Sequence, residues 1–200
     1  VGNAQGEYSL RQAIRDYLHS ARGVHCRPEQ ILVGAGSEYL LMLLSQLIGR
    51  STGIALENPT YKQAFRVFES LGHPIFPVSM DEWGMKVKEL EKTQARIAYV
   101  MPSHQYPTGI VIPIKRRQEL LKWAKKQEGR YLIEDDYDSE FRYKGRPIPA
   151  LQGMDDSQKV IYMGTFSRSI APAIRVGFMV LPEPLLALYR EKAGFIYGFR

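Results

Sequence analysis

Short apolar runs alternate with longer segments of helical periodicity along the whole chain. Apolar residues recur every three or four positions in four segments, and this spacing predicts helices at residues 10–18, 39–48, 61–71 and 114–126. Compact apolar runs between them predict strands at residues 31–33, 53–56, 74–78, 96–101, 131–133, 160–163 and 176–181. This alternation predicts an α/β domain with a parallel or mixed sheet and helices on both of its faces.

The residues with the most distinctive chemistry follow predicted strands. Glycines, hydroxyls, carboxylates and arginines gather in four such segments, at residues 34–37, 102–109, 134–138 and 164–175. In open α/β sheets, ligands bind beyond the carboxyl ends of the strands. We therefore expect the four segments to contribute to one shared site.

The composition fits one globular domain that spans residues 1–200. Of the 200 residues, 44% are hydrophobic and 24% are charged, which is enough to bury a core. The chain has no apolar run of roughly 18 residues and no signal-like N-terminal segment, so we expect neither a membrane span nor secretion. The single cysteine, Cys26, cannot form an internal disulfide, which suits the cytoplasm.

The net charge of +6 is modest, and the basic residues are spread along the chain. The densest basic run, residues 115–126, lies on a predicted amphipathic helix and favours a solvated helix face over a nucleic-acid patch. The chain begins without a methionine and ends just after an apolar helical stretch. We therefore expect it to be a fragment of a longer protein.

A glycine-rich turn, Gly34-Ala35-Gly36-Ser37-Glu38, joins a predicted strand to a predicted helix. Its glycines let the backbone approach a ligand closely. The helix N-terminus offers free N–H groups and a partial positive charge, which suits a phosphate. The segment lacks the third glycine of a dinucleotide fingerprint and the lysine of a P-loop, so a plain glycine turn stays an equal alternative.

Four carboxylates crowd into residues 134–138, and three interpretations of this run are open. It can be a solvated acidic turn or a divalent-metal site. Alternatively, one carboxylate holds a protonated ring nitrogen while Tyr137 bonds a phenolate. The segment at residues 164–175 places hydroxyls and guanidinium groups in a turn after a strand, which suits a phosphate ester.

Together these motifs resemble the fold-type-I aminotransferases that depend on pyridoxal 5'-phosphate (PLP). More narrowly, they resemble the aminotransferase-like domain of MocR-type regulators in the GntR superfamily. His-Gln-Tyr-Pro-Thr-Gly at residues 104–109 and Asp-Asp-Tyr-Asp-Ser-Glu-Phe at residues 135–141 point to the MocR branch, since ordinary aminotransferases usually carry Asn-Pro-Thr-Gly in the first. The resemblance covers nearly the whole chain. It implies the large, cofactor-carrying domain of this fold, an α/β three-layer sandwich with a mostly parallel mixed sheet. The small C-terminal domain and the N-terminal winged helix are not included.

The resemblance implies a role toward PLP for each matched residue. The residues expected around the phosphate are Gly36, Ser37, Glu38, Thr165, Ser167 and Arg175. The residues expected around the ring are Tyr61, Gln105, Tyr106, Asp135, Tyr137 and Arg168. Within this second set, Tyr61 would stack on the pyridine ring, Asp135 would pair with its protonated nitrogen, and Tyr137 would bond its phenolic oxygen. No metal is expected.

Arg168 departs from the family, because this position matches the lysine that forms the Schiff base with PLP. The motif at residues 164–167 and Arg175 beyond it fix the alignment. Arginine stays protonated, with a pKa above about 12, so it can neither attack the aldehyde nor remove the Cα proton. We therefore expect no transamination at normal rates. Arg168 can still pair with the phosphate or the phenolate and hold PLP non-covalently.

Two further positions differ from ordinary aminotransferases. Glu38 replaces a glutamine that is common in the family, and its carboxylate would repel a phosphate unless it points away. Tyr106 replaces an asparagine, which is normal for the MocR branch.

Three functions follow from the resemblance. The first is the effector domain of a cytoplasmic, homodimeric MocR/GntR-type regulator that binds PLP, an amino acid or an amine, and reaches DNA only through a winged helix outside this chain. The second is an active aminotransferase that acts on an amino acid and a 2-oxo acid. The third is a degenerate dimerisation scaffold without PLP. Loss of the lysine damages a sensor less than an enzyme, which favours the first.

Overall fold

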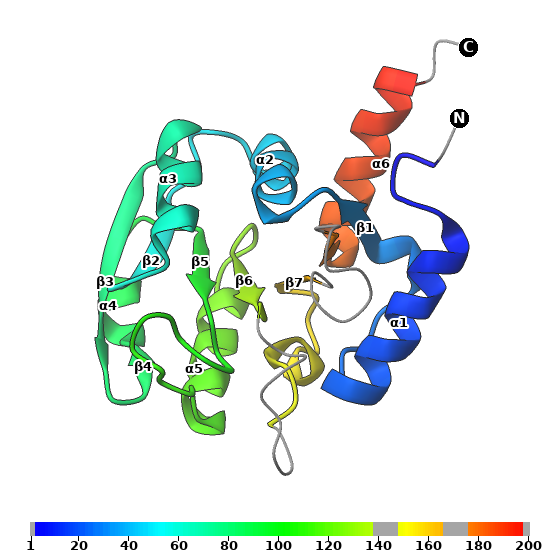
Figure 1. Cartoon of the computed structure of the whole chain (residues 1–200). Helices are drawn as coiled ribbons and strands as arrows, with labels where there is room; N and C mark the ends of the chain where they lie inside the picture. The colour runs from blue at the N-terminus through cyan, green and yellow to red at the C-terminus, as the bar shows by residue number, and fades with distance from the viewer. Residues whose placement is uncertain (1–2, 138–147, 166–175, 198–200) are drawn as a thin grey trace.

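A computed structural model describes residues 3–137, 148–165 and 176–197 of the chain (Figure 1). Within these residues, eight strands form one sheet in the spatial order β1 (Ile31–Gly34), β8 (Gly177–Val180), β7 (Val160–Thr165), β6 (Tyr131–Asp135), β5 (Ile97–Val100), β2 (Ile54–Asn58), β3 (Ile75–Asp81) and β4 (Gly84–Met85). Strand β8 is antiparallel to both of its neighbours and β4 is antiparallel to β3, whereas the other paired strands are parallel. The mostly parallel mixed sheet predicted from the sequence is confirmed.

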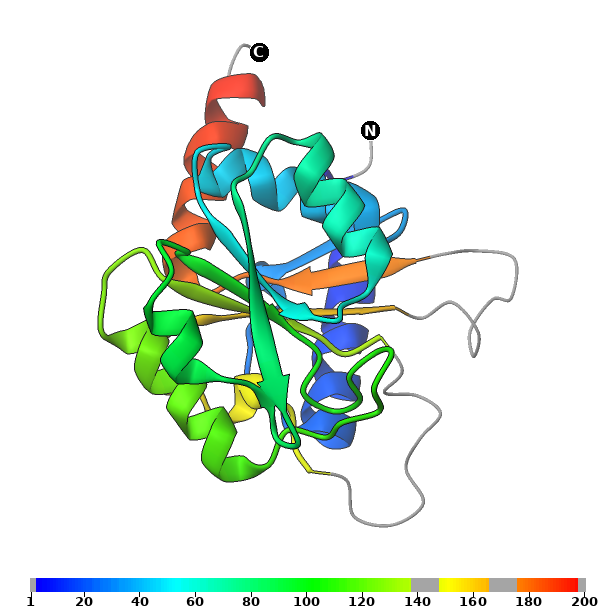
Figure 2. The same cartoon turned by 90° about the vertical axis from the view of Figure 1, so that its left-hand side faces the viewer.

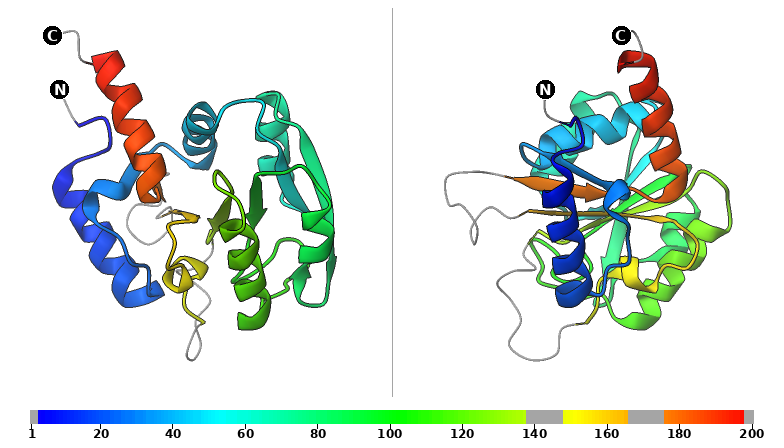
Figure 3. Two further views of the ribbon diagram at one scale, coloured as in Figure 1. Left: turned by 180° about the vertical axis from the view of Figure 1, so that it is seen from behind. Right: turned by 90° about the vertical axis from the view of Figure 1, so that its right-hand side faces the viewer.

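The helices form two layers against this sheet (Figure 2). One face carries α2 (Ser37–Ile48), α3 (Lys62–Ser70) and α6 (Glu183–Tyr197). The other face carries α1 (Tyr8–Arg22), α4 (Val87–Glu91) and α5 (Ile114–Lys125). The predicted three-layer sandwich is therefore confirmed. Seen from behind, α1 and α6 both lie at the β1 end of the sheet (Figure 3).

Alternation along the strands divides the core between the two layers. Ile133 of β6 packs in the cluster that contains α2 and α3, whereas its neighbour Leu132 packs in the cluster that contains α5. Successive side chains of a strand point to opposite faces of a sheet, so both faces of the central strands are apolar. This explains why the strands read in the sequence as continuous apolar runs. None of the described helices is both long and apolar enough to span a membrane.

Four short elements were not predicted: β4, α4 and the 3-10 turns Pro28–Gln30 and Leu151–Met154. Each has five residues or fewer, which is too short to show a periodicity. The basic run at residues 115–126 was predicted as a solvated helix face, and this is wrong for two of its residues. Arg116 and Arg117 are buried. Arg117 donates to the carbonyl oxygens of Ile112 at 2.7 Å and Pro102 at 3.1 Å, and so holds the loop that precedes α5.

The strand directions bring the predicted chemistry to one edge of the sheet. Strands β2, β5, β6 and β7 are parallel and end at this edge, at Asn58, Val100, Asp135 and Thr165. Strand β1 ends there too, because two antiparallel steps through β8 restore the direction of β7. The turn after β1 and the loops after β5 and β6 therefore leave the sheet at the same edge, with the loops after β5 and β6 next to each other and β8 and β7 between them and β1.

Candidate functional site

The turn between β1 and α2 leaves the start of α2 open to a ligand. Gly36 is the N-cap of this helix and has a φ of 98°, a backbone conformation that other residues rarely adopt. No side chain caps the helix, so the N–H groups of its first turn, from Ser37 onward, keep the capacity to bind an anion. A Cβ built on Gly36 would meet no atom within 4 Å, so there is room in front of the turn.

Glu38, in the first turn of α2, uses its carboxylate to accept a hydrogen bond from Nε2 of Gln63 in α3. The side chain is thus engaged with a neighbouring helix. A glutamate at this position is compatible with a phosphate when its carboxylate is bound elsewhere and its backbone N–H is the group offered to the ligand.

Thr165 lies beside the glycine turn because of the sheet register. It pairs with Gly177 of β8, which pairs in turn with Gly34 of β1. A Cβ built on Gly177 would lie 3.2 Å from the carbonyl carbon of Gly36, so glycine at position 177 lets β8 pack directly against the turn. The structure thus brings Thr165 and the predicted phosphate turn to the same corner of the sheet.

Asp135 ends β6 and is partly accessible at this edge. The buried Tyr99 of β5 donates a hydrogen bond from Oη to Oδ2 of Asp135. Burial raises the pKa of Asp135 to about 6, and the bond from Tyr99 opposes this rise. A carboxyl group with this pKa is mostly ionised at neutral pH, so Asp135 can pair with a protonated ring nitrogen.

The carboxylates on either side of Asp135 have structural partners. Glu134 is buried and accepts two backbone N–H groups from the 3-10 turn Leu151–Met154, at 2.7 and 2.9 Å. Asp136 is buried as well, and accepts from Nε of Arg22 at 2.7 Å and from Oη of Tyr162 at 2.5 Å. The solvated-turn interpretation is wrong for both residues. The described part of the chain contains no cluster of three or more His, Cys, Asp or Glu residues that could hold a metal ion.

Tyr61 and Tyr106 form an aromatic pair from two adjacent loops. Their rings meet edge to face with centroids 6.0 Å apart, and their exposed fractions are 39% and 51%. Gln105, which is fully buried, joins the two loops. Its Nε2 donates to the carbonyl oxygen of Pro59 at 2.8 Å, and its Oε1 accepts the N–H of Thr108 at 3.0 Å. These bonds give Gln105 a role in holding the aromatic pair, and its predicted contact with a cofactor stays a prediction.

Glu57, near the end of β2, is a buried carboxyl that the predicted site did not include. Its Oε1 accepts the N–H of Met101 at 3.2 Å. Burial raises the pKa of Glu57 to about 8, and the charge of Asp135 adds to the rise, while the Met101 N–H and the Gln105 side chain oppose it. Glu57 is therefore mostly protonated at neutral pH. Glu57 follows the apolar strand predicted at residues 53–56 and opens the Glu-Asn-Pro-Thr-Tyr motif at residues 57–61, but neither signal assigned it a role.

Three predicted cofactor residues, Ser167, Arg168 and Arg175, lie outside the described residues, and so does Asp138 of the acidic run. Tyr137 is described and is exposed by 36%. The roles expected for these residues toward the cofactor stay predictions.

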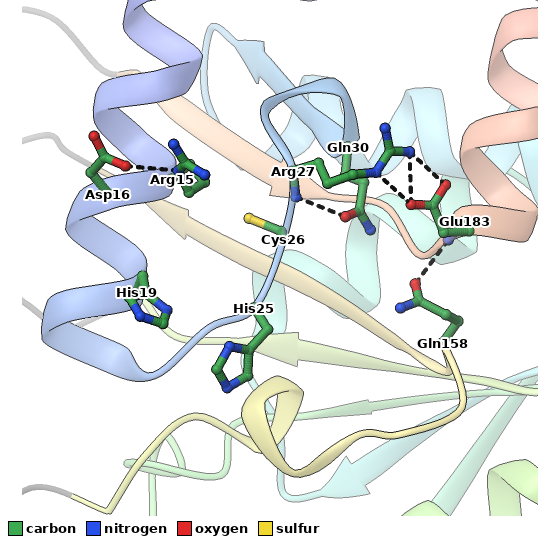
Figure 4. A pocket seen from close by; sticks show the side chains of 9 residues that line it. All are labelled: Arg15, Asp16, His19, His25, Cys26, Arg27, Gln30, Gln158 and Glu183. Atoms are coloured by element: carbon green, nitrogen blue, oxygen red, sulfur yellow. Dashed lines mark hydrogen bonds and ion pairs between the residues drawn. The ribbon is translucent and has the colours of Figure 1, made fainter.

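A hollow of about 630 Å³ lies elsewhere, beside α1 (Figure 4). Its lining consists of Arg15, Asp16, His19, His25, Cys26, Arg27, Gln30, Gln158 and Glu183. The lining residues next to the sheet precede β1 and β7 or follow β8, so the hollow is at the opposite end of the strands from the candidate site. Arg27 pairs with Glu183 at 2.8 Å, and burial raises the pKa of the Cys26 thiol to about 11. The hollow contains no predicted site residue.

Comparison with known proteins gives matches over nearly the whole chain. The family model for aminotransferase class I and II matches residues 1–199. The uncharacterised HTH-type transcriptional regulator YdeL of Bacillus subtilis is 45% identical over 185 residues, which cover 92% of this chain and 40% of YdeL. The probable rhizopine catabolism regulatory protein MocR of Rhizobium meliloti is 37% identical, over 90% of this chain and 36% of MocR.

A solved structure with the same fold is LysN, the α-aminoadipate aminotransferase of Thermus thermophilus, in complex with N-(5'-phosphopyridoxyl)-L-leucine. It is 29% identical, with a TM-score of 0.81, and the match covers 97% of this chain and 50% of LysN. The chain thus spans half of this enzyme, and 40% or less of the length of the two regulators.

Proposed function

Because this chain belongs to the aminotransferase class I and II family, we propose that it is the PLP-binding, aminotransferase-like effector domain of a MocR-type transcriptional regulator. The similarity to YdeL and MocR over at least 90% of the chain supports the regulator. The phosphopyridoxyl compound in the similar LysN structure supports the cofactor. The observation that carries the proposal is Asp135, a carboxylate held by Tyr99 at the same edge of the sheet as the open start of α2.

The described residues fit the parts of PLP one by one. The N–H groups at the start of α2 and the hydroxyl of Thr165 would bind the phosphate, which the positive end of the helix dipole favours. Asp135 would accept the ring N–H, and Tyr61 would cover a face of the ring. When bound, PLP supplies an electrophilic aldehyde on an electron-withdrawing ring. The protein's part is to hold the ring nitrogen protonated and to orient the ring.

Arg168 determines how we expect PLP to be held. A guanidinium group that stays protonated offers no lone pair for a covalent bond to the aldehyde. We therefore expect PLP to be held non-covalently, with Arg168 as a cation near the phosphate or the phenolic oxygen. Without a base at this position, transamination is not part of the proposal.

The proposal extends to the whole regulator, of which this chain is one part. It would act in the cytoplasm as a homodimer and would bind DNA through a winged helix outside this chain. Its effector would be PLP itself, an amino acid or an amine.

Calorimetric titration with PLP tests the proposal. We expect the wild-type protein to bind PLP, and Asp135→Asn to bind it about tenfold more weakly, because the charge-assisted bond to the ring nitrogen is lost. Asp16→Asn is the matched control, since Asp16 is an exposed carboxylate on α1. Equal affinities for wild type and Asp135→Asn would contradict the assigned role of Asp135.

Arg168→Lys separates the remaining functions. If the rest of the pocket is intact, the variant forms a covalent bond to PLP that borohydride reduces, and intact-mass spectrometry detects the added cofactor. If neither the wild type nor this variant binds PLP, the chain is a scaffold without cofactor. Turnover of an amino acid with a 2-oxo acid by the wild type would support the aminotransferase instead.

A further inference from the structure

We propose that Tyr99 is a positioning residue that acts through Asp135, fixing this carboxylate in its ionised form for the ring nitrogen of the cofactor. The inference rests on the proposed function, because it assigns a partner to a residue of the same site. It concerns a side chain that none of the sequence motifs singled out.

The sheet register brings Tyr99 to Asp135. Tyr99 of β5 pairs with Ile133 of β6, and Asp135 lies two residues further along the same strand. Residues two apart in a strand point to the same face, so Tyr99 and Asp135 share one face of the sheet. The Oη–H group of Tyr99 donates to Oδ2 of Asp135. A carboxylate has about four acceptor positions, so this bond leaves capacity for a ring N–H.

The phenol of Tyr99 is fixed by its own surroundings. Tyr99 is only 1% exposed. Its ring meets the ring of Phe68, a fully buried residue of α3, edge to face with centroids 6.2 Å apart. Because the ring cannot rotate without opening a cavity in the core, the hydroxyl group stays directed at Asp135. Asp135 itself is partly accessible to solvent.

The charges around Asp135 make this bond important. Burial raises the pKa of Asp135, the neighbouring carboxylate of Asp136 raises it further, and the hydrogen bond from Tyr99 and the backbone N–H of Tyr137 lower it. Glu57 on β2 is the other acid near this group, and the charge of Asp135 helps to keep it protonated. Without the phenol, burial and the negative neighbour act on Asp135 with less opposition, so its neutral form becomes more favourable.

Tyr99 itself is a permanent donor. Burial raises the pKa of Tyr99 well above its ordinary value, and the charge of Asp135 adds to the rise. The phenol therefore keeps its proton across the physiological range. The phenol stabilises the carboxylate of Asp135 by donating a hydrogen bond and does not transfer its proton to it.

Tyr162 provides a matched control within the same sheet. It is also fully buried, and its phenol also donates to a carboxylate, that of Asp136 at 2.5 Å. Asp136 already has the guanidinium of Arg22 as a partner at 2.7 Å and lies on the opposite face. Tyr162→Phe therefore removes the same kind of buried bond without touching Asp135.

The test is the pH dependence of PLP binding, measured by calorimetry for the wild type, Tyr99→Phe and Tyr162→Phe. In Tyr99→Phe we expect the acidic midpoint of binding to move upward by about one pH unit, so that the affinity falls about threefold just below neutral pH and up to about tenfold below the wild-type midpoint. Tyr162→Phe should keep the wild-type midpoint. The phosphate of PLP titrates in the same range, but its contribution is common to all three proteins and cancels in the comparison.

The outcomes separate the inference from the proposed function. If the wild type binds PLP and Tyr99→Phe has the same midpoint and affinity, the inference is overturned and the proposed function stands. If the wild type does not bind PLP, both are overturned. If Tyr99→Phe does not fold, 3-fluorotyrosine placed at position 99 replaces it. The fluorinated phenol is a stronger donor, so the midpoint should then move downward, and an unchanged midpoint overturns the inference.

Discussion

Replacing Glu57 with glutamine tests whether a neutral carboxyl group is buried beside the candidate site. Glu57 is 1% exposed, and burial raises its pKa from 4.5 to about 8. At pH values between 4.5 and about 8, the Glu57 carboxyl has lost its proton in the unfolded chain but keeps it in the folded protein. The free energy of unfolding therefore falls as the pH rises through this window, since the folded state resists the ionisation that the unfolded state permits.

The size of the effect follows from the width of the window. Each pH unit within it costs about 1.4 kcal/mol of unfolding free energy. Between about pH 5.5 and about pH 7, the wild type should lose about 2 kcal/mol from this group alone. Glu57→Gln keeps the size of the side chain and an acceptor for the N–H of Met101, and it does not titrate. The stability of the variant relative to the wild type should therefore rise by the same amount over this range.

Urea unfolding at the two pH values measures this difference. The buried Trp123 supplies the fluorescence signal. Titrating groups that do not interact with Glu57 contribute equally to both proteins, so their contributions cancel. The reasoning is refuted if the difference between variant and wild type is the same at both pH values. That result would mean that Glu57 is ionised in the folded protein.

Three further substitutions have outcomes set by the same contacts. Glu134→Gln should lower the free energy of unfolding by about 1–3 kcal/mol, because one of two buried backbone N–H groups loses its acceptor; an unchanged urea midpoint would contradict this. Arg22→Met should cost about 3–5 kcal/mol by leaving Asp136 buried without its guanidinium partner, and adding Asp136→Asn should recover part of the loss in urea unfolding. Gly36→Ala should cost about 1–3 kcal/mol, because its backbone conformation is nearly exclusive to glycine, and calorimetry should show weaker PLP binding; wild-type affinity would argue against a phosphate at this turn.

The layer architecture could be predicted because it depends on patterns that are local in the sequence. The alternation of short apolar runs with helical periodicity repeats many times, so an error at one boundary does not change the fold class. The strand order was not predicted. It depends on which strands pair, and β8 lies between β1 and β7 although β1 and β8 are far apart along the chain.

Most features of the site that the sequence did not predict are side-chain contacts between residues far apart along the chain. The guanidinium of Arg22 bonds Asp136, 114 residues further along the chain. Neither residue carries a local sign of this pairing. Tyr99 reads as one more apolar position of a strand, since the polar end of a tyrosine leaves no trace in the periodicity. Such partners are decided by sheet register, which local patterns do not specify.

The choice of Asp135 among the crowded acids came from a family resemblance, and the strand geometry supplies a physical reason for it. Glu134 and Asp136 point to the face of α1 and α5, where backbone N–H groups and Arg22 occupy them. Asp135 points to the opposite face, the one on which α2 begins at Ser37. A ligand that takes its ring-nitrogen bond from Asp135 and its phosphate bonds from the start of α2 must therefore lie on that face of the strand ends. Glu134 or Asp136 could take the place of Asp135 only if β6 shifted its register by one residue, which would turn each of its side chains to the other face of the sheet.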